Sequence, residues 1–433
     1  MEKKSPPCLA PWTHSYCSPQ GERRLCCASR EPATNFKQYI DTDGPEGEVK
    51  IPTLDDHWNS EHMKRIRREH MAGNLPPECE VCDKKLLNTD VYRDYFEHMF
   101  KHHREEILAK TEPDGTYHGM PISWDYRYSN KCNLKCRMCG PMLSSSWEVE
   151  AKKHNETYSE PWMDYKVELD VNQTMMFAEM WNQIPSTEEI YWVGGEPLMF
   201  REHWSMMSDI VKTTKFAENI YVRYNTNLTR ITDPYKIWHT HLYLLLSMFR
   251  DWQICASLDG TGAVGEYIRT GLDYNEFIEN FEKGLAARWH PGQMRLDFTL
   301  TTPGLFEVRN MFNLSKKYNV PLLSKVCFEF SNDIAMCPLF LPKDVLHPIA
   351  QELIDELAPQ ADRNQRPLID VLKNLLTRDT MEDKYSDYME GRIKGKRRIE
   401  QLEEIRLQPI TMQEIFSQHS EAALDFWNGI RTD

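Results

Sequence analysis

The chain has 433 residues, of which 40% are hydrophobic and 27% charged, and its formal net charge at pH 7 is −14. These values are typical of a globular protein with two or three domains. The acidic excess argues against a general electrostatic attraction to nucleic acid or to an anionic membrane. No apolar run approaches the ~18 residues of a membrane span. Because no apolar segment follows the charged N-terminus, as it would in a secretory signal, we expect a cytoplasmic protein.

Cysteines are concentrated in the first third of the chain, where nine of the twelve lie before residue 140. Without an export signal, this placement favours metal binding over disulfides. The remaining three are scattered. Two of them, Cys255 and Cys327, lie in strand-like runs, where we expect small buried side chains.

Four of the early cysteines could form one metal site. Turn-forming residues between Cys8 and Cys26 predict a hairpin or back-folded loop that brings these two thiols together. A Cys-x2-Cys pair, Cys79 and Cys82, follows a helical stretch over residues 55–71. Four thiolates are a complete ligand set for zinc or for a fully protein-ligated iron–sulfur cluster, and the spacing leaves both open.

A second cysteine group has the spacing Cys132-x3-Cys136-x2-Cys139 and follows an apolar run directly. Three thiolates cannot by themselves complete a tetrahedral zinc site or an even set of disulfides. They can hold three irons of a four-iron cluster, which leaves the fourth iron open for another ligand.

From residue 116 onward, strand-like and helix-like segments alternate. The predicted strands cover residues 122–128, 189–193, 220–224, 253–258, 295–301 and 322–330. The predicted helices cover residues 171–184, 203–213, 234–248, 274–289 and 307–318. Repeated β-then-α units indicate a parallel sheet with helices outside it. In such a fold the chemistry lies at the carboxyl ends of the strands.

Small and polar residues follow these strand ends. The sequence Gly194-Gly195-Glu196-Pro197 comes after the second strand, where two glycines let the backbone approach a ligand and a carboxylate can accept from an ammonium group. The third and fourth predicted strands end in polar side chains suited to bind hydroxyl and carboxylate groups, and Arg269 could pair with a carboxylate or form a structural ion pair. These strand-end candidates are Asn225, Thr226, Ser257 and Asp259.

The three-cysteine loop and the Gly-Gly-Glu-Pro sequence together resemble the radical SAM superfamily. The resemblance implies a partial (β/α)6 TIM-type barrel, with a SAM-binding [4Fe-4S] cluster held by Cys132, Cys136 and Cys139. It assigns the cofactor's amino group to the Gly194–Pro197 motif and further contacts to Ser257, Asn225, Thr226 and Asp259. Met138 stands where many members have an aromatic residue that packs on adenine.

The N-terminal cysteines resemble the SPASM/twitch module of radical SAM maturases. This likeness implies that Cys8, Cys26, Cys79 and Cys82 hold a second, auxiliary [4Fe-4S] cluster, with Cys27 competing with Cys26 and Cys17 a bystander. In most of the wider family the module follows the barrel, whereas here it precedes it. The order leaves open how the auxiliary cluster faces the substrate.

The sequence thus predicts three parts: an N-terminal cysteine-rich module (1–115), a radical SAM barrel (116–340) and a helical C-terminal extension (341–433). Helix-like segments in the extension include 342–357, 368–378 and 389–406. The last of these contains a basic run, Lys394 to Arg398, that continues into acidic residues, a pattern typical of an exposed helix.

The resemblance implies an enzyme that cleaves S-adenosylmethionine to a 5′-deoxyadenosyl radical, which abstracts a hydrogen atom from a peptide or protein. A flavodoxin- or ferredoxin-type reductant would supply the electron. Two alternatives remain open. One is radical modification of a small molecule, a sugar or a nucleotide. The other is a non-catalytic iron–sulfur or zinc protein, against which the Gly-Gly-Glu-Pro motif argues because a plain cluster carrier needs no amino acid site.

Overall fold

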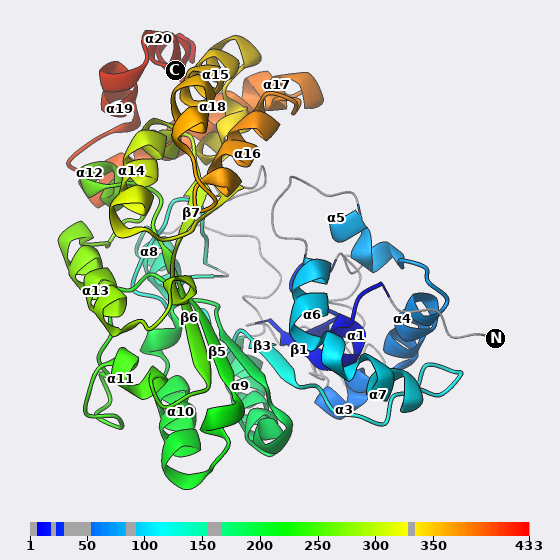
Figure 1. Ribbon diagram of the computed structural model, residues 1–433. Coiled ribbons are helices and arrows are strands. Elements are labelled where there is room, and N and C mark those ends of the chain that lie inside the picture. The colour runs from blue at the N-terminus through cyan, green and yellow to red at the C-terminus, as the bar shows by residue number, and fades with distance from the viewer. Residues whose placement is uncertain are drawn as a thin grey trace.

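The computed structural model describes residues 7–18, 23–29, 53–83, 92–141, 143–154, 166–327 and 334–432. In this part of the chain eight strands form one sheet in the order β2-β1-β3-β4-β5-β6-β7-β8. Every neighbouring pair is parallel except β1 and β2. The sheet stays open, with helices on its outside (Figure 1), which confirms the predicted partial TIM-type barrel.

All six predicted strands of the barrel are present. They are β3 (Ser123–Tyr126), β4 (Glu189–Trp192), β5 (Tyr221–Thr226), β6 (Asp251–Ser257), β7 (Met294–Leu300) and β8 (Leu322–Val326). The main helices between them are α8 (Ser145–Lys153), α9 (Lys166–Gln183), α10 (Arg201–Thr213), α11 (Leu242–Leu246), α12 (Gly262–Ile268), α13 (Tyr274–Ala287) and α14 (Val308–Tyr318). Residues 328–330 of the last predicted strand lie outside the described residues.

The strands separate two kinds of side chain because successive residues point to opposite faces of a sheet. Trp192, Val222, Ile254 and Phe298 face the outer helices and are at most 1% exposed. Residues at the alternate positions face the inside of the barrel and are mostly polar and partly exposed. The apolar core therefore lies between sheet and helices, and mostly polar side chains line the concave inner face.

The predicted helix over residues 234–248 is wrong in its first half, because only α11 is helical. The Asp233 carboxylate accepts from the backbone N–H groups of Tyr235 (2.7 Å) and Trp238 (2.6 Å), which folds this segment into turns. Lys236 lies there at a φ of 59°, in the left-handed region. Hydrogen bonds from these N–H groups to the Asp233 side chain thus replace the hydrogen bonds of a helix.

Residues 7–120, which we call the N-terminal module, have a separate apolar core that includes Trp12, Leu25 and Phe96. The predicted helix over residues 55–71 is divided in two, because Ser60 caps a new helix by accepting from the Met63 N–H. The elements are α1 (Ala10–Thr13), β1 (His14–Cys17), β2 (Arg23–Arg24), α3 (Leu54–Trp58), α4 (Glu61–Met71), η1 (Pro77–Cys79), α5 (Glu80–Asp83), α6 (Tyr92–Phe100), η2 (Lys101–His103) and α7 (Arg104–Ala109).

The N-terminal module shares the sheet with the barrel. Strand β1 pairs in parallel with β3, with Ser15 opposite Trp124, and antiparallel with β2, as the predicted hairpin requires. Its connecting residues 19–22 lie outside the described residues. Helix α6 also contacts the barrel, where the Tyr95 hydroxyl donates to Glu189. The module and the barrel are therefore joined by backbone and side-chain hydrogen bonds.

The C-terminal extension lies beside the opposite edge of the sheet (Figure 1). The Leu322 N–H of β8 donates to the Asn364 carbonyl at 2.9 Å, and the buried Leu368 and Leu372 lie on the helix that packs against β8. The extension comprises α15 (Lys343–Leu357), α16 (Arg366–Leu375), α17 (Met381–Lys384), α18 (Tyr388–Arg406), α19 (Met412–His419) and α20 (Glu421–Gly429). None of the helices among the described residues has the length and apolarity that crossing a membrane requires.

The prediction that the charged segment 389–406 is an exposed helix is wrong for one of its faces. Lys396 is 9% exposed, and its ammonium group donates to the carbonyls of Trp427 (2.9 Å) and Ile430 (3.0 Å). Ile399 and Leu402 are buried on the same helix, α18. The basic run therefore includes a lysine that holds the last helix of the chain in place.

Candidate functional site

The three-cysteine loop connects β3 to α8 at the carboxyl edge of the sheet. The thiols of Cys136 and Cys139 are hydrogen-bonded to each other. The Cys132 sulfur lies 3.9 Å from the Asn227 amide nitrogen, and the Cys136 sulfur lies 3.9 Å from the Arg269 guanidinium. The structure thus brings two of the three thiols into direct contact and surrounds the group with nitrogen donors.

Burial controls the protonation of these thiols. It raises the pKa of Cys132 to about 12, so that side chain is a neutral thiol in the bare protein. A hydrogen bond from Cys139 lowers the pKa of Cys136. A cationic metal centre would favour all three thiolates, since metal binding deprotonates cysteine. Three sulfur donors on one buried loop therefore fit an iron–sulfur cluster better than they fit a set of free thiols.

The loop is held by the barrel and by α8. The backbone N–H groups of Lys135 and Arg137 donate to the carbonyls of Thr270 (2.8 Å) and Ile268 (2.9 Å), directly after α12. The buried Trp147 indole of α8 donates to the Cys136 carbonyl at 2.9 Å. The cysteines therefore project from a backbone whose position is fixed from two sides.

The Gly194–Pro197 motif lies against the same loop. Gly194 and Gly195 have φ values of 87° and 51°, which glycine adopts at little cost. A Cβ on Gly195 would lie 2.5 Å from the Lys131 carbonyl oxygen, so any larger residue would displace the loop. The Glu196 N–H donates to this carbonyl at 2.8 Å. A Cβ on Gly194 would lie 2.7 Å from the Arg127 Cβ, so close contact requires glycine at both positions.

Glu196 has an almost fully buried carboxylate that is 1% exposed. It accepts from the Thr226 hydroxyl (2.7 Å) and from the N–H groups of Asn227 (2.7 Å) and Leu198 (3.1 Å). Burial raises its pKa to about 7, and these hydrogen bonds oppose the rise. The carboxylate is therefore held in one orientation and titrates near neutral pH.

Asp259 and Arg269 form a buried ion pair at 2.7 Å. Asp259 also accepts from the Thr299 N–H at 2.7 Å, and Arg269 reaches toward Cys136. Of the two predictions for Arg269, the structure shows the ion pair, and it places this pair beside the cysteine loop. The pair links the ends of β6 and β7 to the candidate cluster ligand Cys136.

The other predicted site residues lie in different surroundings. Asn225 faces the inside of the barrel and donates to Asp297 at 3.1 Å, while Thr226 bonds to Glu196 instead. Ser257 lies at the end of β6, partly exposed, and Met138 packs against the barrel core. Sequence reasoning assigned no role to Asn227, although it directly follows two of the assigned residues.

The C-terminal extension supports the cysteine loop from outside. The Arg406 side chain, which is completely buried, pairs with Glu150 of α8 at 2.7 Å and donates to the Lys135 carbonyl at 3.0 Å. Its guanidinium also lies 4.3 Å from the centre of the Trp147 ring. This residue was not singled out from the sequence, because Glu150, Lys135 and Trp147 lie more than 250 positions away in the chain.

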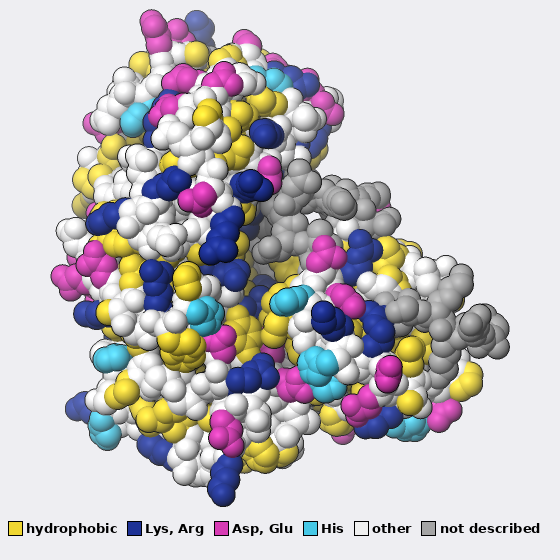
Figure 2. Space-filling view, in the orientation of Figure 1, with side chains coloured by type: hydrophobic (Ala, Val, Ile, Leu, Met, Phe, Trp, Pro, Cys, Tyr) yellow, Lys and Arg dark blue, Asp and Glu magenta, His cyan; other side chains and the backbone are white. Residues whose placement is uncertain are grey.

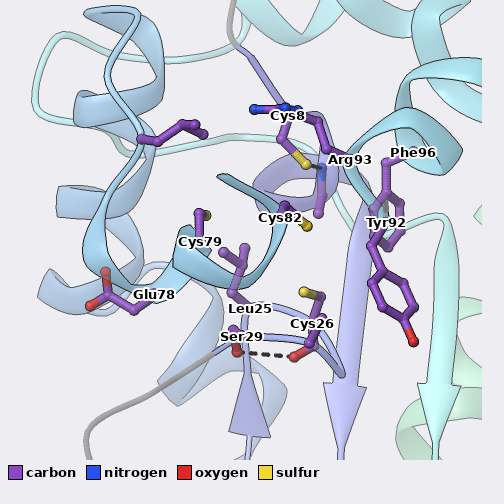
Figure 3. A pocket seen from close by; sticks show the side chains of 13 residues that line it. Cys8, Leu25, Cys26, Ser29, Glu78, Cys79, Cys82, Tyr92, Arg93 and Phe96 are labelled. Carbon is purple, nitrogen blue, oxygen red and sulfur yellow. Dashed lines mark hydrogen bonds between the residues drawn. The ribbon is translucent and has the colours of Figure 1, made fainter. Parts of the chain in front are cut away.

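The four predicted thiols of the N-terminal module line one pocket (Figure 3). Cys8 precedes α1, Cys26 follows β2, and Cys79 and Cys82 come from the turn formed by η1 and α5. Burial raises the pKa of Cys8 to about 12 and that of Cys26 well above its usual range. Residues from three separate segments thus place four sulfur donors around a buried space, which matches the ligand set of a closed metal centre.

Cys26 and Cys27 point to different surroundings. Cys26 lines the pocket, whereas the Cys27 thiol is hydrogen-bonded to the Tyr92 hydroxyl and lies near Asp125 and Arg127 of the barrel. Cys17 is fully buried in the barrel core. Among the competing cysteines, only Cys26 faces the other three thiols.

His70 is a further residue of this pocket region that sequence reasoning missed. Its Nε2 lies 3.5 Å from the Cys79 sulfur, and the ring packs edge-on against Trp12. Burial lowers the pKa of His70 to about 4, so the ring is neutral. It can therefore donate one hydrogen bond to a thiolate without adding charge.

Two family matches agree with this geometry. Residues 126–307 match the radical SAM superfamily, and residues 8–83 match the SPASM iron–sulfur cluster-binding domain. The first match covers the three-cysteine loop, Glu196 and the Asp259–Arg269 pair. The second covers all four thiols of the N-terminal pocket. No curated protein matches the chain.

Several solved structures are similar to parts of the chain. SuiB from Streptococcus suis bound to S-adenosylmethionine is 12% identical with a TM-score of 0.37, and the match covers 66% of this chain and 58% of SuiB. Native anSMEcpe with bound AdoMet and the Cp18Cys peptide is 17% identical with a TM-score of 0.33, and the match covers 53% of this chain and 57% of that protein. The chain therefore spans less than two thirds of either structure.

The chain thus contains a radical SAM domain, the class of domain that binds S-adenosylmethionine and a [4Fe-4S] cluster. More particularly, it carries a SPASM-type domain that binds auxiliary iron–sulfur clusters, and this domain precedes the barrel in the chain.

Replacing Arg406 by glutamine should weaken retention of the cluster at the cysteine loop. The substitution removes one of the two cations that pair with Glu150, the other being Lys135, and it removes the charge of the group that donates to the Lys135 carbonyl. We expect faster iron loss to a chelator from the variant than from the parent. The control is Arg397→Gln, because Arg397 is exposed and its hydrogen bonds within the described part of the chain go to the Thr432 carbonyl. Equal rates of iron loss in both variants would contradict this role.

Proposed function

We propose that this enzyme reductively cleaves S-adenosylmethionine to methionine and a 5′-deoxyadenosyl radical, which takes a hydrogen atom from a peptide or protein substrate. The observation that carries the proposal is that the three thiols, the Glu196 carboxylate and Arg269 meet at one edge of a parallel sheet. Asn227 connects these groups, because its N–H donates to Glu196 and its side chain reaches Cys132.

The proposed ligands of the SAM-binding cluster are Cys132, Cys136 and Cys139. Glu196 would accept from the amino group of the cofactor, and its three hydrogen bonds fix the carboxylate in place for that contact. Arg269 would remain paired with Asp259 and balance negative charge next to Cys136. The further proposed cofactor-binding residues are Gly194, Gly195, Pro197, Asn225, Ser257, Asp259 and Met138.

We propose one auxiliary [4Fe-4S] cluster with Cys8, Cys26, Cys79 and Cys82 as its ligands. The pocket they line supports four protein ligands, which leaves no iron open for substrate. Such a cluster suits electron transfer from a substrate radical or the placement of substrate at the barrel. The reductant would be a one-electron donor of the flavodoxin or ferredoxin type.

A peptide substrate is supported by the SPASM match and by the shape of the barrel. The inner face of the sheet is polar and partly exposed, as binding an extended polar chain requires. The N-terminal module and the C-terminal extension cover the two edges of the sheet, so the substrate would enter between them. The inner face, the N-terminal module and the C-terminal extension would position the substrate and limit access of water, while the cofactors supply the radical chemistry.

The experiment that tests the proposal compares the anaerobically reconstituted parent with the triple variant Cys132→Ala, Cys136→Ala, Cys139→Ala. We expect about eight irons in the parent and about four in the variant. Only the reduced parent should form 5′-deoxyadenosine and show an EPR signal that S-adenosylmethionine perturbs.

Two outcomes would contradict parts of the proposal. About four irons plus one zinc in the parent would make the N-terminal pocket a structural zinc site. No 5′-deoxyadenosine from a parent with a fully occupied SAM-binding cluster would make the protein a cluster carrier.

Substituting Cys26 and Cys27 one at a time tests which of these two neighbouring cysteines is a ligand of the auxiliary cluster. Cys26→Ala should lower the iron content by about four, because it removes one of the four thiols that face the pocket. Cys27→Ala should keep this iron, because Cys27 contacts Tyr92 instead. Iron analysis with EPR of each variant provides the measurement, and the opposite result would assign the ligand to Cys27.

Binding of S-adenosylmethionine should strengthen as pH rises through the pKa of Glu196. With a pKa of about 7, Glu196 is mostly neutral at pH 6 and mostly charged at pH 8. Only the charged form attracts an ammonium group, so we expect an affinity gain of about tenfold over this range. Calorimetry should show the gain in the parent and in the exposed control Glu218→Gln. The gain should be absent in Glu196→Gln, and its persistence there would contradict the assignment.

A further inference from the structure

The inner face of the barrel is lined by charged and aromatic side chains. Side chains alternate along each strand, so that each residue facing the outer helices is followed by one facing inward. The inward side chains on β3 to β5 include Asp125, Tyr191, Arg223 and Asn225. Those on β6 to β8 include Gln253, Cys255, Ser257, Arg295, Asp297, Thr299, Leu323 and Lys325. A face of this composition is suited to bind a polar, charged ligand.

Half of this inner face is occupied by the N-terminal module. The Tyr95 hydroxyl of α6 donates to Glu189, and the Arg223 guanidinium lies 4.4 Å from the Tyr95 ring centre. Arg223 also pairs with Glu189 at 3.2 Å, and Arg127 pairs with Asp125 at 3.2 Å. The charges on β3 to β5 are therefore neutralised by partners within the protein.

The other half, on β6 to β8, carries one positive charge, that of Arg295, which no carboxylate of the described residues pairs with. The Lys325 ammonium lies 2.9 Å from Asp297, which also accepts from the Asn225 amide at 3.1 Å. Arg295 is two residues from Asp297 on the same side of β7, and it is partly exposed. Among the described residues it forms no ion pair with a carboxylate, and its Nε donates to the Gly292 carbonyl at 3.3 Å.

This local charge contrasts with the chain as a whole, whose net charge is −14. Figure 2 shows Lys and Arg side chains gathered along the hollow between the barrel and the N-terminal module. A guanidinium presents several N–H donors in a planar arrangement that matches a carboxylate. An inward-facing arginine without a carboxylate partner in an acidic protein points to a ligand that supplies the carboxylate.

We propose that the substrate is an acidic peptide that binds a side-chain carboxylate on Arg295 at the inner face of the barrel. This rests on the proposed function, since it names the substrate class of the same site. Arg295 and Thr299 are four residues apart on β7, a rise of about 13 Å at 3.3 Å per residue. An extended peptide has nearly the same rise. We therefore expect the acidic residue of the peptide to lie within about four positions of the peptide residue that reaches the strand ends. The candidate cofactor site lies at these strand ends.

The test is calorimetric titration of the reconstituted full-length protein with two capped peptides, tetraglutamate and tetraglutamine. These probes match in length and differ in charge. We expect the parent to bind tetraglutamate about tenfold or more tightly than tetraglutamine. Arg295→Gln should abolish this preference, and Arg295→Lys should keep part of it. Arg309→Gln is the matched control, because Arg309 is an exposed arginine paired with Glu352 and Glu356 outside the barrel.

Equal affinity of the parent for both peptides would overturn the proposal, and so would a preference that survives in Arg295→Gln. A third probe, adenosine monophosphate, tests phosphate as the anion. Arg295-dependent binding of this nucleotide without binding of tetraglutamate would also overturn the peptide assignment. Formation of 5′-deoxyadenosine is measured separately, so failure of the proposed radical chemistry is distinguished from failure of the proposed acidic substrate.

Discussion

The buried pair of Asp259 and Arg269 connects more parts of the site than any other interaction described above. Asp259 accepts from the Thr299 backbone, which ties the end of β6 to the end of β7, while Arg269 extends the contact to Cys136. Removing water from two charges is costly, and the cost is offset only while both partners keep their geometry. The contact between Arg269 and Cys136 therefore depends on an ion pair that is destabilised by the loss of either member.

Both edges of the open sheet are protected by added parts of the chain. An exposed edge strand leaves unpaired N–H and C=O groups that invite association with other chains. Here β1 and β2 extend the sheet beyond β3, and the Asn364 carbonyl before α16 accepts from the Leu322 N–H of β8. The same two additions carry functional groups, since one holds four thiols and the other places Arg406 against the cysteine loop.

Short-range sequence patterns were sufficient to predict the six β/α units, the three-cysteine loop and the Gly-Gly-Glu-Pro turn. Each of these is encoded within a few neighbouring residues. The pairing of β1 with β3 and the contact of Arg406 with Glu150 were not predicted, and the choice of Cys26 over its competitor Cys27 rested on a resemblance alone. They depend on which distant segments meet, and the period of a strand or helix does not contain that information. The failed helix at residues 234–248 shows that one aspartate cap can override helical periodicity.

The parallel pairing of β1 with β3 also constrains how the protein is made. Residues 14–17 leave the ribosome more than a hundred residues before their partners at 123–126. A long loop must close before this pairing forms, which makes the contact a late event in folding. Cys8 lies before β1 and Cys26 lies after β2, so the strand between these two thiols takes its place in the sheet only after the barrel's first strand has been synthesised.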